Sequence, residues 1–214
     1  MKIVNINKYK WRSNKMKVKD EIIELENGLK QNNIDHIYSL QEVEKISKDI
    51  LTIFGFSSKK TSIPIVKIVK EFDFNIYKES LPDKLSGDIY INGNTIDEYG
   101  HDKVILVNKN EHLFHQRFVA AHELAHYLFD FLGNPLYNDK NIKFSDTYYK
   151  DQHETPEEKI ANWFAASIMM PKDIFIEQYN FAKKEYSKTT FVMLYLSRYF
   201  ETPIDSIEKR FSEV

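Results

Sequence analysis

The sequence predicts an α+β fold, in which a small β-sheet is flanked by helical segments. Three observations support this prediction. Apolar residues recur at helical spacing on both sides of the middle of the chain, short strand-like segments lie between them, and a strong turn signal separates two of those segments. Helices, a small sheet and then two further central helices form an order typical of α+β domains.

The composition limits the class of protein before any motif is considered. The chain has 214 residues, of which 42% are hydrophobic, and this is enough for one sizeable core. It contains no cysteine, which excludes disulfides and thiolate metal ligands, so any metal must bind through nitrogen and oxygen. No apolar signal segment begins the chain, and no run of about 18 apolar residues occurs anywhere. We therefore expect a cytoplasmic protein that does not enter a membrane.

The first 58 residues are predicted to form an N-terminal helical extension. Lysines and an arginine dominate residues 2–19, and amphipathic sequence follows over residues 20–30. Without a nucleic-acid motif beside them, these charges are interpreted as a solvated face or a frayed terminus rather than an interaction arm. Apolar spacing from Leu40 to Phe54 then predicts a helix that covers the core and ends at Gly55.

The middle of the chain changes from helical to strand-like patterns. A helix is predicted to begin at Ser62-Ile63-Pro64 and to reach Phe72, and residues 74–77 alternate like a short strand. Residues 87–91 and 103–107 are also strand-like. The turn signal Asn92-Gly93-Asn94 lies between those two segments and predicts that they pair.

His122, Glu123 and His126 form the pattern H-E-x-x-H, which is typical of metallohydrolases. Apolar spacing over residues 114–129 predicts that the motif lies on a helix with one face in the core, ended by Gly133. Residues four apart on a helix share a face, so the two histidines can chelate one Zn²⁺ while Glu123 reaches a water at the metal. Both imidazoles must be neutral to bind.

Glu158 is the candidate third ligand, because a zinc peptidase needs three protein ligands and the motif supplies only two. It opens a segment of small and apolar residues, 158–169, that predicts a second buried helix. Thr155 and Pro156 allow another interpretation, in which Glu158 completes a capping box without touching metal. The fallback ligands are Asp146, His153, Glu154 and Glu157.

The end of the chain, residues 187–214, resembles a helix-turn-helix, with helices predicted over 191–200 and 204–211. Asp205 and Glu208 offset the charges of Lys209 and Arg210, which argues against direct nucleic-acid binding and favours packing or protein docking. Four histidines without ligand spacing to one another are predicted to be surface residues, and Tyr127 and Tyr137 to be core or rim residues. These histidines are His36, His101, His112 and His115.

Several sequence blocks occur together and in a characteristic order, namely Val107-Asn108, Gln116 to Tyr127, Glu158 to Ala166, and Met169-Met170-Pro171. In this combination the chain resembles the ImmA/IrrE family of metallopeptidases over roughly residues 62–171. Ala120 and Ala125 differ from the residues common in the family, but neither position carries a catalytic group.

This resemblance implies a zincin-like metallopeptidase core at residues 59–186, between the N-terminal extension and the C-terminal helices packed on the core. It implies one Zn²⁺ per chain, held by His122, His126 and Glu158, with Glu123 as the catalytic residue. The implied substrate is a protein, a transcriptional repressor or a similar regulator, held as an extended segment along a strand edge. Two alternatives remain, an antirepressor or stress regulator that acts by binding alone, and a DNA-binding regulator.

Overall fold

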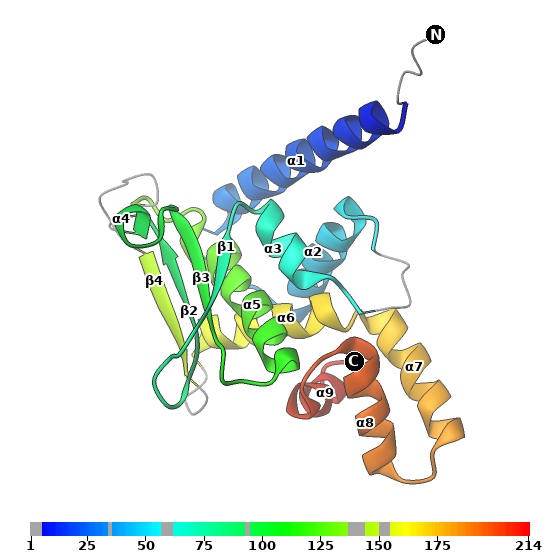
Figure 1. The fold of residues 1–214 in the computed structure, drawn as a ribbon. Coiled ribbons are helices and arrows are strands. Elements are labelled where there is room, and N and C mark those ends of the chain that lie inside the picture. The colour runs from blue at the N-terminus through cyan, green and yellow to red at the C-terminus, as the bar shows by residue number, and fades with distance from the viewer. Residues whose placement is uncertain (1–5, 34–35, 57–61, 93–94, 137–143, 150–154) are drawn as a thin grey trace.

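The computed structural model describes residues 6–33, 36–56, 62–92, 95–136, 144–149 and 155–214, and a four-stranded sheet lies at one side of it (Figure 1). The strands are β1 (Asn75–Glu79), β2 (Leu85–Ile91), β3 (Lys103–Asn108) and β4 (Phe144–Tyr149). Their order is β1-β3-β2-β4. Strand β1 is parallel to β3, whereas β2 is antiparallel to both β3 and β4. Strand β4 therefore forms one edge of this sheet, and the predicted α+β class is confirmed.

Two central helices, α5 (Leu113–His126) and α6 (Pro156–Met169), pack against each other, and α5 also contacts β2 and β3. Small side chains let the helix backbones approach closely, because alanine adds little volume at the contact. The buried alanines of the two helices are Ala120, Ala121, Ala125, Ala161, Ala165 and Ala166. Helix α5 continues directly into a short π-helix, η1 (Tyr127–Phe131).

Three helices precede the sheet: α1 (Ile6–Asn32), α2 (Leu40–Ile53) and α3 (Ile65–Glu71). Helix α2 begins with a capping box, in which Ser39 and Glu42 satisfy each other's backbone amides. It packs against α6, while α3 packs against α5. Helix α1 projects from the body of the protein (Figure 1). Of its side chains that the structure describes, residues 16–32, those of Ile22 and Leu29 are buried.

The chain ends in three helices, α7 (Lys172–Glu185), α8 (Thr189–Phe200) and α9 (Ile204–Phe211), that lie at the opposite side of the molecule from the sheet (Figure 1). Arg210 of α9 is fully buried. Its Nη1 lies 2.9 Å from Glu44 of α2 and 3.0 Å from Glu213, and its Nε donates to the carbonyl oxygen of Met170. These contacts join α9 to α2 and to the end of α6.

The predicted helices before and after the sheet and the predicted pairing of β2 with β3 are confirmed. Among the described residues, the elements that were not predicted are the short helix α4 (Thr95–Tyr99) in the β2–β3 connection, the edge strand β4, α7 and the π-helical form of η1. Within the described part of the chain, no helix combines the length and the apolar character required to cross a membrane.

Candidate metal centre

Helix α5 places His122 and His126 one turn apart on the same face, as their spacing predicts. The two side chains are essentially inaccessible, with 0% and 1% of their surface exposed. Their Nε2 atoms point at each other across 3.0 Å. Two imidazole nitrogens thus converge on one buried point.

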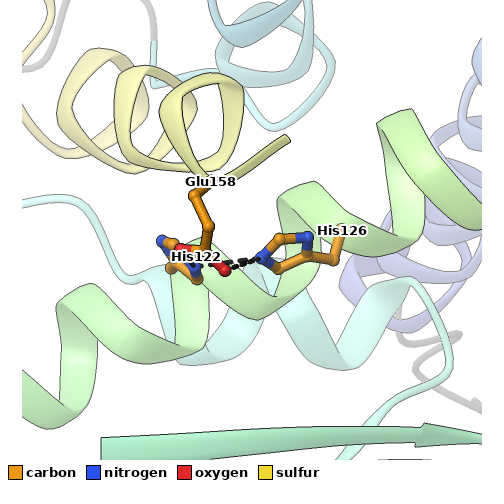
Figure 2. Close-up of side chains that lie close together, drawn as sticks. All are labelled: His122, His126 and Glu158. Carbon is orange, nitrogen blue, oxygen red and sulfur yellow. Dashed lines mark hydrogen bonds and ion pairs between the residues drawn. The ribbon is translucent and has the colours of Figure 1, made fainter. Parts of the chain in front are cut away.

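Glu158 reaches this point from the first turn of α6 (Figure 2). Its Oε2 lies 3.3 Å from Nε2 of His122, and its Oε1 lies 3.6 Å from Nε2 of His126. The competing interpretation, a capping box at the start of α6, is confirmed for Thr155 but not for the side chain of Glu158. Thr155 does cap α6, because its hydroxyl oxygen accepts the backbone N–H of Glu158, but the glutamate carboxylate turns to the histidines.

The three side chains fit a zinc site. Each offers one ligand atom, and these atoms lie within 4.8 Å of one another. A tetrahedral ion with bonds of about 2.0–2.1 Å separates its ligand atoms by about 3.3 Å. The two Nε2 atoms are 3.0 Å apart, and each has one of the two oxygens of Glu158 near it, Oε2 at 3.3 Å from His122 and Oε1 at 3.6 Å from His126. Two nitrogens and one carboxylate leave a fourth position open, as in catalytic zinc sites. The metal-binding capacity is therefore evident from the donor set.

The electrostatics favour the protonation states that metal binding requires. Burial lowers the pKa of His122, which keeps the imidazole neutral, although contact with Glu158 opposes this shift. Burial alone would raise the pKa of Glu158, but its hydrogen bond to His122 and its electrostatic interaction with the two histidines outweigh burial and hold the pKa below its usual range. A neutral imidazole and an ionised carboxylate are the ligand forms.

Glu123 lies one residue beyond His122, and its side chain is fully buried. The backbone of β2 passes close to it at Gly87, where a Cβ atom would lie 2.9 Å from Oε1 of Glu123 and 2.2 Å from Cγ1 of Val119. Glycine at this position is therefore required for the strand to approach the helix. Gly87 was not predicted as a site residue, although a glycine inside a strand pattern is a known signal of close backbone approach.

Asp130 is a second residue that the sequence analysis missed. Its Oδ2 lies 2.6 Å from Nδ1 of His126, the ring nitrogen opposite the Nε2 atom that faces His122 and Glu158. The spacing of four residues after His126 was a usable signal, because such pairs share a helix face.

The edge strand β4 runs beside the metal centre. The ring of Tyr148 packs on the ring of His122, with centroids 4.1 Å apart. His115, predicted to be a surface residue, is instead partly buried, and its Nε2 lies 3.1 Å from the hydroxyl of Ser86, because the first turn of α5 faces β2. The other three histidines predicted at the surface, His36, His101 and His112, are exposed.

The structure places the remaining candidates apart from this point or outside the described residues. Glu157 is exposed at the start of α6. His153 and Glu154, and the side chain of Asp146, lie outside the described part. Tyr127 is buried in the core, as predicted, and Tyr137 lies outside the described residues.

Comparison with protein families places this geometry in a known context. Residues 69–212, more than half of the chain, match the model of a peptidase family described as the IrrE N-terminal-like domain. The matched segment contains the sheet, the H-E-x-x-H motif and Glu158. The comparison with curated proteins finds no match.

Proposed function

The chain belongs to the ImmA/IrrE family of metallopeptidases, and from this premise we propose that it is a zinc-dependent endopeptidase that cleaves a regulatory protein. The observation that carries the proposal is the convergence of His122, His126 and Glu158 on one buried point, with Glu123 buried directly after His122 on the same helix. We assign the first three side chains to one Zn²⁺ per chain and Glu123 to catalysis.

Zn²⁺ held by this donor set would polarise the scissile carbonyl and lower the pKa of its bound water to about 7. Glu123 then acts as the general base, because it follows His122 directly on the helix that supplies both imidazoles. It removes a proton from the attacking water as the oxygen adds to the carbonyl carbon. The same carboxylate delivers that proton to the leaving amine nitrogen when the C–N bond breaks.

The edge strand β4 supports a protein substrate bound in extended form. An edge strand presents backbone N–H and C=O groups to which a further strand can pair. The contact between Tyr148 of this strand and His122, a proposed ligand, supports such an arrangement. Backbone pairing gives affinity with little sequence preference, so selection of the substrate must rest on other contacts.

We propose a transcriptional repressor or a similar regulator as the substrate, on the basis of the family resemblance. Such a substrate implies action in the cytoplasm. The charge balance of α9 still argues against direct DNA binding, and buried Arg210 is already engaged by two carboxylates.

The test compares the wild-type protein with Glu123→Gln, which keeps the shape of the side chain but removes its basicity. Metal analysis should find zinc in both proteins, and mass spectrometry of co-purified partners should find a cleaved protein only with the wild type. His126→Ala, a matched loss of a ligand, should lose metal and cleavage together. If Glu123→Gln still relieves repression by a captured partner, the protein acts by binding alone, and the proteolytic assignment fails.

A further inference from the structure

The π-helix η1 begins at the residue after His126, at the end of the helix that carries the metal centre. The wide turn is closed by the N–H of Leu132, which donates to the carbonyl oxygen of Tyr127 over 3.0 Å. π-Helical turns are rare and occur frequently at functional sites.

Asp130 lies in this π-turn and accepts a hydrogen bond from the imidazole of His126, with 2.6 Å between Oδ2 and Nδ1. An Nδ1–H held in this way fixes the tautomer in which the Nε2 lone pair is free for a metal. That Nε2 is the atom facing His122 and Glu158. The position of Asp130 therefore determines both the rotation of the His126 ring and its strength as a ligand.

The π-turn is held from outside by Asn33, which follows the last residue of α1. Its Nδ2 donates to two carbonyl oxygens of the turn region, that of Leu128 over 2.7 Å and that of Leu132 over 2.6 Å. The hydroxyl of Tyr38 donates to Oδ1 of Asn33, so the amide nitrogen must face the two carbonyls. These carbonyls lie at the end of the helix, where the last carbonyl groups have no N–H donor within the helix.

Two more contacts bring the end of α1 against the same region. The hydroxyl of Tyr127 donates to Oε1 of Glu26 over 2.6 Å. Gly133 has a φ of +89°, and a Cβ added there would lie 2.9 Å from the carbonyl oxygen of Lys30. Helix α1 thus touches the π-turn at its start, through Tyr127, and just beyond its end, through Gly133.

We propose that Asn33 and Asp130 are positioning residues of the metal centre, with Asn33 clamping the π-turn and the π-turn holding Asp130 against His126. The proposal rests on the proposed function, since it presupposes that His126 binds metal. It assigns a role to the N-terminal helix: α1 supports the metal centre from about a hundred residues away in the sequence. A partner that draws α1 away would weaken metal binding.

The experiment measures the affinity for Zn²⁺ by competition with a chromogenic chelator. Asp130→Ala should lower the affinity by about 10–100-fold, the usual effect of removing a residue that orients a ligand. Asp130→Asn retains an acceptor for Nδ1–H, so its affinity for Zn²⁺ should lie between those of Asp130→Ala and the wild type. A purely structural role would not produce this order in variants of equal stability. The control Asp205→Asn, an exposed site on α9, should bind like the wild type.

The clamp is tested with Asn33→Asp, which is nearly isosteric but replaces the donor with an oxygen facing two carbonyl oxygens. Zn²⁺ affinity should fall by about 10-fold or more, whereas the same change at the exposed neighbour, Asn32→Asp, should have no effect. If Asn33→Asp does not fold, Tyr38→Phe provides the second test. It frees the amide to rotate and should lower the affinity several-fold.

Substitution with Co²⁺ adds a readout independent of activity, because its visible absorption reports the ligand geometry. Asp130 and Asn33 variants should bind Co²⁺ with altered spectra. If the wild type and His126→Ala bind Zn²⁺ equally poorly, the proposed function fails. If the wild type binds tightly and Asp130→Ala, Asn33→Asp and Tyr38→Phe all match it in affinity and spectrum, the positioning role is refuted.

Discussion

Replacement of Gly87 by alanine tests the close approach of β2 to the helix that carries Glu123. The added Cβ would lie 2.2 Å from Cγ1 of Val119 and 2.9 Å from Oε1 of Glu123. Carbon atoms in contact prefer about 3.5–4.0 Å, so the strand and helix must separate by roughly 1.3 Å or more. Gly87 and Val119 are both buried, and overpacking of this kind lowers the unfolding free energy by about 1–3 kcal/mol. For a domain of this size, the melting temperature should fall by about 2–12 °C.

The effect on catalysis should exceed the effect on stability. A misplacement of about 1 Å at a catalytic group lowers the rate by about 10²-fold, so kcat/KM for a cleaved regulator or a generic casein substrate should fall by that factor. Gly87→Ala/Val119→Ala removes the shorter contact but not the one to Glu123. The double variant should therefore be less destabilised than the sum of the single variants and should remain poorly active.

Gly28→Ala is the matched control, since nothing lies within 4 Å of a Cβ at that helical position. It should stabilise the protein by about 0.5–1 kcal/mol, because alanine is the better helix former. A Gly87→Ala protein with wild-type melting temperature and activity would refute the argument from close approach.

Three further predictions concern the remaining buried contacts. Arg210→Ala leaves Glu44 without its buried cation and should lower the unfolding free energy by about 3–5 kcal/mol; an unchanged urea midpoint would contradict this. Thr155→Ala removes a helix cap and should lower the unfolding free energy by about 1 kcal/mol without loss of zinc affinity. Glu158→Gln should instead lower the zinc affinity. If Glu158→Gln lowers only stability and keeps zinc affinity, Glu158 acts as a cap and not as a ligand. Burial lowers the folded-state pKa of His122 below 6.5, so protonation favours unfolding, and the metal-free protein should lose stability as the pH falls below about 6.5; equal stability at pH 7.5 and 5 would contradict this.

The sequence was sufficient to predict contacts that follow from local periodicity. The spacing of His122 and His126 determined their common face, and the helical pattern after Glu158 predicted the helix that brings this residue to them. Whether Glu158 caps its helix or faces the histidines could not be read from the sequence, because both outcomes start from the same Thr155-Pro156 signal. The choice depends on the packing of α6 against α5.

Contacts between distant segments account for what was missed. Strand β4 pairs with β2 across a long intervening stretch, and no local turn signal marks that pairing. Asn33 contacts carbonyls at Leu128 and Leu132, and a polar residue after a helix gives no indication of such a partner. The π-turn was hidden because residues 127–131 are apolar around Asp130, which is compatible with continued α-helix.

The π-turn also constrains how this chain can change in length. A π-turn contains one more residue than the α-helical turn that it replaces, so it has the geometry of a single-residue insertion. Deletion of one residue between His126 and Gly133 would restore regular helix and rotate the following side chains by about 100°. Gly133 would then lose its close approach to the carbonyl oxygen of Lys30 in α1. Insertions and deletions should therefore not be tolerated between His126 and Gly133.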